Sequence, residues 1–211
     1  MALFLQHQGE DCHWAVWKLE ETLEELLSLL PDSRKYRQEV EKFSSAHRRL
    51  EWCAVRVLLY TILGVEKEIR YQDSGKPYLA DKSFSLSISH TKGYVAVILG
   101  DINKNKEVGI DIEQYGERVR KVAHKFVRDD ELPGAYEGTD TWGMLLHWSA
   151  KEAVYKCLNI DSVDFREHLY ICQFTVCSEG TFGLVEYRTA ECCHFSVHYR
   201  LFADFVLTYI C

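Results

Sequence analysis

The second half of the chain opens with the stretch Val108-Gly109-Ile110-Asp111-Ile112-Glu113, in which apolar and acidic residues alternate. Alternation with a period of two is typical of a β-strand, and it places Asp111 and Glu113 on the same face of that strand. The stretch therefore predicts a strand that presents two carboxylates to one place.

A second acidic cluster lies in the stretch Trp148-Ser149-Ala150-Lys151-Glu152-Ala153-Val154-Tyr155-Lys156. These residues favour a helix, on which Glu152 and Lys156 lie one turn apart on the same face. Three carboxylates without a histidine or thiolate suit a hard ion such as Mg²⁺, which usually keeps water and substrate phosphate among its ligands. The two clusters together predict one Mg²⁺ site and a phosphate-bearing substrate. Either cluster alone is also compatible with a structural role at the surface.

The composition limits the classes of protein to consider. With 211 residues, 47% of them hydrophobic, the chain has the size of one large domain or two small ones. Its net charge of -7 argues against general nucleic-acid binding. No apolar run reaches the roughly 18 residues of a membrane span, and Met1 to Gly9 lacks the pattern of a secretory signal, so we expect a cytoplasmic protein. The cysteines form no C-x-x-C pair and predict no zinc site.

Hydrophobic periodicity predicts the elements of the first half. Leucines at helical spacing predict a helix within residues 14–30, which Pro31 ends. A second helix is expected after Ser44-Ser45, which offer an N-cap, and is expected to end at Gly64. Residues 71–79 are rich in turn formers, and residues 84–89 and 94–99 predict a hairpin of two strands.

The second half repeats the order of helix followed by strands. After the strand 108–113, helical sequence is expected to about Phe126, turns at 129–141 and a helix around Glu152. Strands are expected at 169–177, 182–188, 193–200 and 203–210. This order predicts an α+β architecture of two similar lobes, residues 1–100 and 101–211.

Four motifs resemble, in their order along the chain, those of the 4'-phosphopantetheinyl transferases. The resemblance is in particular to the larger single-chain, pseudo-dimeric class, of the type that activates surfactin synthetase. Two are the acidic stretches above, and the other two are Gly75-Lys76-Pro77 and Ser87-Ile88-Ser89-His90. The resemblance implies two pseudo-symmetric lobes, each a small, mostly antiparallel sheet packed with helices, with a ligand cleft between them. The N-terminal lobe would bind coenzyme A, and the C-terminal lobe would carry the metal site and meet the carrier protein.

The resemblance also implies an activity. The enzyme would move the 4'-phosphopantetheine arm of coenzyme A to a serine of an acyl or peptidyl carrier protein and release adenosine 3',5'-bisphosphate, in fatty-acid, polyketide or nonribosomal peptide biosynthesis. Asp111, Glu113 and Glu152 would hold Mg²⁺. Glu152 would accept the serine proton, and Lys156 would balance charge on the transferred phosphoryl group.

Further residues are expected to contact coenzyme A. Ser89 and His90 would donate hydrogen bonds to its 3'-phosphate. The remaining expected contacts come from cationic side chains and one turn residue: Lys76, Pro77, Arg49, Arg56, Lys151 and Lys156.

A basic segment predicts the docking surface for the partner. Between residues 117 and 128, an apolar stripe is accompanied by the cationic or titratable residues Arg118, Arg120, Lys121, His124, Lys125 and Arg128. Carrier proteins of this kind are typically acidic, so this helix is expected to attract one, although a merely solvated basic face fits equally.

Two rival functions remain open from the sequence. The same carboxylates would serve a Mg²⁺-dependent phosphoesterase that acts on water, and a catalytically silent module would bind carrier proteins or coenzyme A without chemistry. A chain that supplies both lobes is expected to act as a monomer, without nucleic acid or membrane as a partner.

Overall fold

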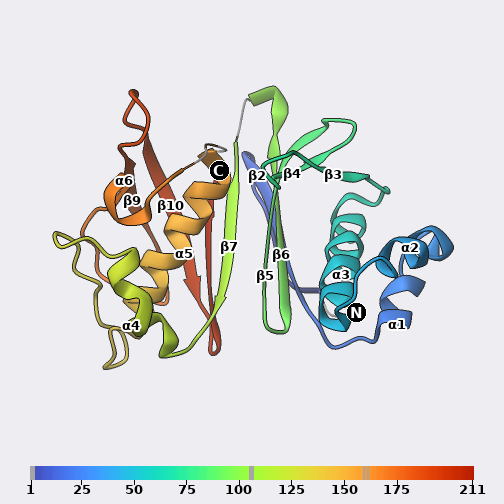
Figure 1. Cartoon of the computed structure of the whole chain (residues 1–211), viewed down its shortest axis with the longest axis horizontal. Helices are drawn as coiled ribbons and strands as arrows, with labels where there is room; N and C mark the ends of the chain where they lie inside the picture. The colour runs from blue at the N-terminus through green and yellow to red at the C-terminus, as the bar shows by residue number, and fades with distance from the viewer. Residues whose placement is uncertain (1–2, 105–106, 159, 161) are drawn as a thin grey trace. The chain divides into compact units, whose positions relative to one another are not determined.

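The computed structural model describes residues 3–104, 107–158, 160 and 162–211 and divides into two compact units. Unit 1 comprises Met1–Glu107 and unit 2 comprises Val108–Cys211, so the boundary follows Glu107 rather than residue 100. Each unit contains antiparallel strands packed with helices (Figure 1). The α+β fold class predicted from the sequence is therefore confirmed.

Unit 1 contains a four-stranded antiparallel sheet in the order β1-β2-β6-β5. Its strands are β1 (Leu3–Gln8), β2 (Cys12–Lys18), β5 (Phe84–Thr91) and β6 (Tyr94–Asp101), and a 3₁₀ turn follows at Ile102–Lys104. The helices are α1 (Leu23–Ser28), α2 (Ser33–Val40) and α3 (Ala46–Leu63). A separate hairpin consists of β3 (Ile69–Tyr71) and β4 (Pro77–Leu79).

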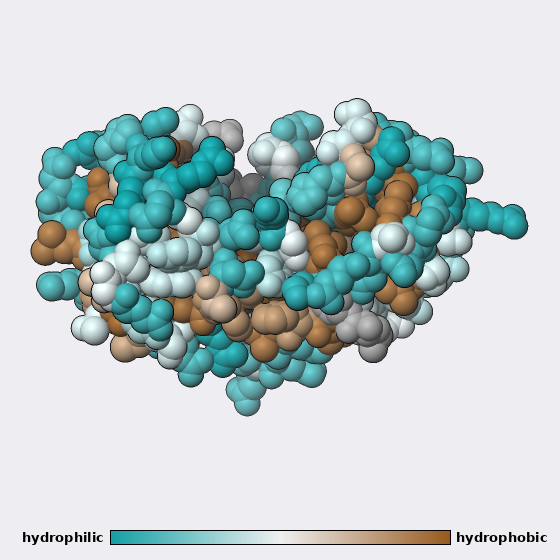
Figure 2. Space-filling view, turned by 90° about the horizontal axis from the view of Figure 1, so that it is seen from below, coloured by the Kyte–Doolittle hydropathy of each residue, from teal (hydrophilic) through white to brown (hydrophobic). Residues whose placement is uncertain are grey.

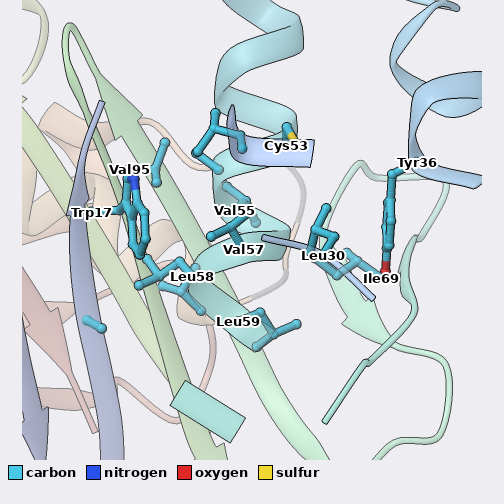
Figure 3. Packing of buried hydrophobic residues seen from close by; sticks show 14 of the residues in the cluster. Trp17, Leu30, Tyr36, Cys53, Val55, Val57, Leu58, Leu59, Ile69 and Val95 are labelled. Atoms are coloured by element: carbon cyan, nitrogen blue, oxygen red, sulfur yellow. The ribbon is translucent and has the colours of Figure 1, made fainter. Parts of the chain in front are cut away.

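The helix α3 is the central helix of unit 1, and its ends are those expected from the sequence. The Ser45 side chain accepts a hydrogen bond from the Arg48 backbone N–H, and Gly64 closes the helix in the left-handed conformation (φ 67°). Buried residues of α3, among them Leu58, pack with Trp17 of β2 and with Leu30 (Figure 3). The apolar face of α3 thus forms the middle of the unit 1 core.

The helix expected within residues 14–30 is wrong for its first part. Residues 12–18 form β2, which pairs with β1 on one side and β6 on the other. Its continuous apolar run from Trp14 to Trp17 is at most 1% exposed, as a strand inside a sheet requires. The helix begins only after Thr22, whose side chain and Glu25 form a capping box.

The turn-rich stretch 71–79 also differs in part from the expectation. It includes the last residue of β3 and the whole of β4, joined through a turn in which Gly75 has φ 86°. The positive φ explains the glycine, because other residues rarely adopt it. The expected hairpin at 84–99 is confirmed as β5 and β6.

Unit 2 contains a five-stranded antiparallel sheet in the order β7-β11-β10-β9-β8. Its strands are β7 (Gly109–Gln114), β8 (Leu169–Ile171), β9 (Glu179–Glu186), β10 (His194–Leu201) and β11 (Phe205–Ile210). The helices are α4 (Arg118–Val122), α5 (Thr141–Leu158) and α6 (Phe165–His168), and a 3₁₀ turn, Ala123–Lys125, follows α4. The expected strand 169–177 is thus shorter, and the expected helix to Phe126 is an α-helix continued by a 3₁₀ turn.

The two units share part of their topology. In unit 1, β2 pairs with the last strand β6, which pairs with β5; in unit 2, β7 pairs with the last strand β11, which pairs with β10. A helix of 18 residues packs against the first two of these strands in each unit, α3 on β2 and β6 and α5 on β7 and β11. This correspondence agrees with the expectation of two similar lobes.

The outer surface is mostly polar on the face drawn in Figure 2, with hydrophobic side chains in smaller patches. Within the described residues, every helix is too short or too polar to serve as a membrane span.

Candidate active site

The acidic strand β7 lies directly beside the helix α5 (Figure 1). Gly109 makes this close approach possible, since a Cβ atom at this position would collide with the backbone carbonyl of Ala153. On the neighbouring strand β11, the Thr208 hydroxyl lies 2.8 Å from the Ser149 hydroxyl of α5. The helix is therefore fixed against the strand that carries the carboxylates.

Asp111 and Glu113 both meet side chains of α5, as their shared face on β7 requires. The Lys156 Nζ atom donates to Asp111 Oδ1 at 2.6 Å and to the Ile110 carbonyl at 3.3 Å. The Trp148 indole N–H donates to Glu113 Oε1 at 2.8 Å. The structure thus brings the two acidic motifs together, as the sequence predicts.

Asp111, Glu113 and Glu152 form what we call the carboxylate cluster. The pKa values of two of these residues indicate that their charges influence one another. Burial, followed by the charge of Asp111, raises the pKa of Glu113 to about 7. Burial also raises the pKa of Glu152, with a further contribution from Asp111 that Lys156 partly opposes. Asp111 itself is only 3% exposed. A cation placed among these groups would relieve their repulsion.

The chemistry of the cluster fits a hard cation, but the cluster is not arranged as a finished metal site. In the part of the chain that the structure describes, no three His, Cys, Asp or Glu side chains form a ready metal-binding group. The Lys156 ammonium instead supplies the positive charge beside Asp111. Carboxylate oxygens are nevertheless the ligands that Mg²⁺ prefers, and the charge of Asp111 contributes, after burial, to the raised pKa values of both Glu113 and Glu152.

Lys151, expected to contact phosphate, occupies the interior of unit 2 instead. Its side chain is 0% exposed, and Nζ donates to the Phe126 carbonyl at 2.6 Å, to Glu131 Oε2 at 2.8 Å and to the Phe165 carbonyl at 3.1 Å. On a helix, residue 151 lies on a different side from residues 152 and 156. We therefore leave Lys151 out of the ligand set.

Unit 1 contains a cavity of about 150 Å³ that gathers several of the expected ligand residues. Arg56 and Pro77 line it, and so does His90 at the end of β5. The Arg56 guanidinium lies 3.3 Å from the ring centroid of Trp52, which also lines the cavity, and donates to the Trp52 carbonyl at 3.0 Å. Cationic side chains, a histidine and an aromatic ring suit an anionic ligand with a flat ring.

Three other expected ligand residues have different surroundings. Ser89 neighbours His90 on β5, so its side chain points to the opposite face of the strand from His90 and Ile88, which line the cavity. Lys76 lies in the turn before β4 and donates to Glu107 at 2.9 Å. Arg49 donates to the Phe43 carbonyl at 2.6 Å. None of these three is among the residues that line the cavity.

Arg48 and Glu51 also line the cavity, although neither belongs to the expected ligand set. Arg48 lies 2.9 Å from His90 through its guanidinium, and Glu51 contacts both the His90 ring and Arg48. Their spacing in the sequence could have identified them as part of one helical face. Residues 48, 51, 52, 55 and 56 follow the i, i+3, i+4, i+7, i+8 pattern of one helical face, and all five line the cavity.

Comparison with known proteins relates unit 2 to one family, while no curated protein matches the chain. The matched region begins one residue before unit 2 and ends one residue before its last residue. It therefore contains both acidic motifs and the helix α5 that joins them. Residues 107–210 match the model of the 4'-phosphopantetheinyl transferase superfamily.

Proposed function

We propose that this protein transfers the 4'-phosphopantetheine arm of coenzyme A to a serine of an acyl or peptidyl carrier protein, with Mg²⁺ as cofactor. One observation carries the proposal: in the region that matches the transferase superfamily, Asp111 of β7 contacts Lys156 of α5, and the charge of Asp111 contributes to the raised pKa values of Glu113 and Glu152. The superfamily supplies the reaction class, and the carboxylate cluster supplies the chemistry that the reaction needs.

In the proposed reaction, the serine oxygen of the carrier attacks the phosphorus atom that bears the pantetheine arm. The bond from this phosphorus to the bridging oxygen of the pyrophosphate breaks, and adenosine 3',5'-bisphosphate leaves with the bond electrons. Glu152 accepts the serine proton, directly or through water. Its raised pKa suits this role, because it makes the carboxylate a better base than an ordinary glutamate.

Asp111, Glu113 and Glu152 would hold Mg²⁺, which, when bound, would neutralise charge on the pyrophosphate oxygens. Lys156 would balance charge on the transferred phosphoryl group. Its Nζ atom is held 2.6 Å from Asp111 and 3.3 Å from the Ile110 carbonyl, which keeps the ammonium beside the carboxylates. The Trp148 N–H orients Glu113.

The anionic end of coenzyme A is assigned to the cavity of unit 1. His90 and Arg56, together with Arg48, would contact the 3'-phosphate and the adenosine that carries it. Arginine forms forked hydrogen bonds with phosphate oxygens, and Trp52 offers a ring face for the base.

A groove of about 360 Å³ in unit 2 is assigned to the carrier protein. Apolar groups of Val119, Val122 and Trp148 line it together with Arg118, and Glu113 of the carboxylate cluster borders it. The neighbouring Lys121 and Lys125 are exposed, whereas Arg120 is engaged by Glu117 and Asp140. An acidic helix with apolar residues on one face matches this surface, and the exposed cations would raise its rate of association.

Intact-mass spectrometry of an apo acyl carrier protein tests the proposal. With the protein, Mg²⁺ and coenzyme A, the carrier is expected to gain one phosphopantetheine unit, and a chelator is expected to prevent the gain. A carrier with alanine at the acceptor serine is the control. No gain on several folded apo carriers would contradict the proposal, and loss of coenzyme A without any carrier would indicate a phosphoesterase instead.

A further inference from the structure

Glu51 is a buried carboxylate at the edge of the unit 1 cavity. It is 5% exposed and lies on the first half of α3. Its Oε1 atom is 3.0 Å from His90 Nδ1 and 3.0 Å from His47 Nε2, and its Oε2 atom is 3.7 Å from the Arg48 guanidinium. All of these partners are cations or can become cations.

A carboxylate in this position needs an explanation, because it lies in a cavity assigned to an anion. Burying a carboxylate is costly unless it is paired, and a second negative charge nearby repels phosphate. Glu51 is best explained if its effect on His90 and Arg48 outweighs that repulsion.

The contacts determine how the His90 ring is held. Arginine has only donors, so His90 Nε2, 2.9 Å from the Arg48 guanidinium, accepts a hydrogen bond. A carboxylate has only acceptors, so Nδ1 carries the proton and donates it to Glu51. Glu51 therefore fixes both the tautomer and the orientation of the ring and leaves Nε2 as the nitrogen for an anion.

The same arrangement prepares a cationic state. To donate to a phosphate oxygen, Nε2 must carry a proton as well, which makes the ring an imidazolium. Glu51 at 3.0 Å compensates this positive charge, and Arg48 can turn its donors from Nε2 to the same phosphate. Arg48 and, through Glu51, His47 are further charged or titratable groups beside the ring.

We propose that Glu51 is a positioning residue that holds His90 and Arg48 for the 3'-phosphate of coenzyme A, and so sets the preference for coenzyme A over 3'-dephospho-coenzyme A. This inference rests on the proposed function, because it takes the cavity of unit 1 as the site of the 3'-phosphate. It assigns to Glu51 no contact with the ligand.

Calorimetric binding of both ligands to the full chain tests the inference. The wild type is expected to prefer coenzyme A, and Glu51→Ala is expected to reduce the preference by about 10- to 100-fold, the worth of a hydrogen bond to a charged group. Glu51→Gln keeps an acceptor for His90 but loses the charge, so its preference should be intermediate. A variant that only disturbs the structure of the cavity would weaken the binding of both ligands equally.

Glu66→Ala is the matched control. Glu66 is also a carboxylate of unit 1, it accepts from Lys35 and Tyr36 at 2.8 and 2.9 Å, and it does not line the cavity. This variant should keep the wild-type preference. Circular dichroism identifies any variant that fails to fold, and Glu51→Gln then replaces Glu51→Ala in the comparison.

The outcomes distinguish the positioning role of Glu51 from the assignment of the cavity to coenzyme A. A wild type that binds neither ligand, or does not distinguish them, would overturn both this inference and the assignment of the cavity to coenzyme A. A wild type that prefers coenzyme A, with folded Glu51 variants that keep or strengthen the preference, would overturn the positioning role alone. Strengthened binding is the result expected if Glu51 merely repels the phosphate.

Discussion

Replacing Lys151 by methionine is expected to lower the free energy of unfolding by about 3–5 kcal/mol, because removing one partner of a buried ion pair leaves the other charge uncompensated. The magnitude follows from the surroundings. Lys151 and Glu131 both have fully buried side chains 2.8 Å apart, and the two carbonyls that accept from Nζ would also lose their donor. For a chain of this size, such a loss corresponds to a fall in Tm on the order of 10 °C.

Urea unfolding followed by circular dichroism measures this loss, and a double-mutant cycle identifies its origin. Glu131→Gln keeps an acceptor for the Ile171 N–H, 2.7 Å from Oε1, while removing the charge. The double variant of Lys151→Met and Glu131→Gln should therefore cost clearly less than the sum of the single variants.

One result would refute this reasoning. If Lys151→Met unfolds like the wild type but loses transferase activity, Lys151 acts on the substrate, as the sequence first indicated, and its burial does not describe the working enzyme. If the stability losses of the two single variants add up fully in the double variant, this would also contradict an ion pair between Lys151 and Glu131.

Three further predictions concern the carboxylate cluster and its support. Asp111→Asn should lower kcat at least about 100-fold with unchanged circular dichroism, because it removes a proposed metal ligand without opening the core; near-normal steady-state rates would contradict the metal assignment. The pKa of Glu113 is raised to about 7, so its contribution to stability is complete below about pH 4.5 and is lost as the pH rises through 7; thermal unfolding in chelator should show this decline, and a Glu113→Gln variant with the same decline would exclude Glu113 as its source. Gly109→Ala should destabilise unit 2 by about 1–3 kcal/mol, because the new methyl group meets the Ala153 carbonyl. Denaturant unfolding measures this loss, and an unchanged midpoint would contradict it.

Local signals in the sequence predicted much of the fold. Ser45 and Gly64 marked the ends of α3, and the alternation at 108–113 identified β7 with its two carboxylates on one face. These signals succeeded because caps and strand periodicity depend on neighbouring residues alone. The helix expected within 14–30 was wrong for its first part, because the apolar run before Leu19 was included in the helix that the leucine spacing predicts. Only the pairing of β2 on both sides determines that residues 12–18 are extended.

The candidate site was predictable where its residues lie in motifs and not where tertiary contacts decide. Asp111 and Lys156 were expected near each other and lie 2.6 Å apart. The burial of Lys151 depends on Glu131 and Phe126, which lie 20 and 25 residues away in the chain. Glu51 is paired with His90 across 39 residues, so its role follows only from the folded unit.

The central claim is tested most directly by the stoichiometry of the two products. With an apo carrier protein, Mg²⁺ and coenzyme A, the account predicts one adenosine 3',5'-bisphosphate released for each carrier that gains phosphopantetheine, and no release without carrier. Release that continues in the absence of carrier, or that exceeds the modified carrier severalfold, would contradict a transferase and identify water as the acceptor.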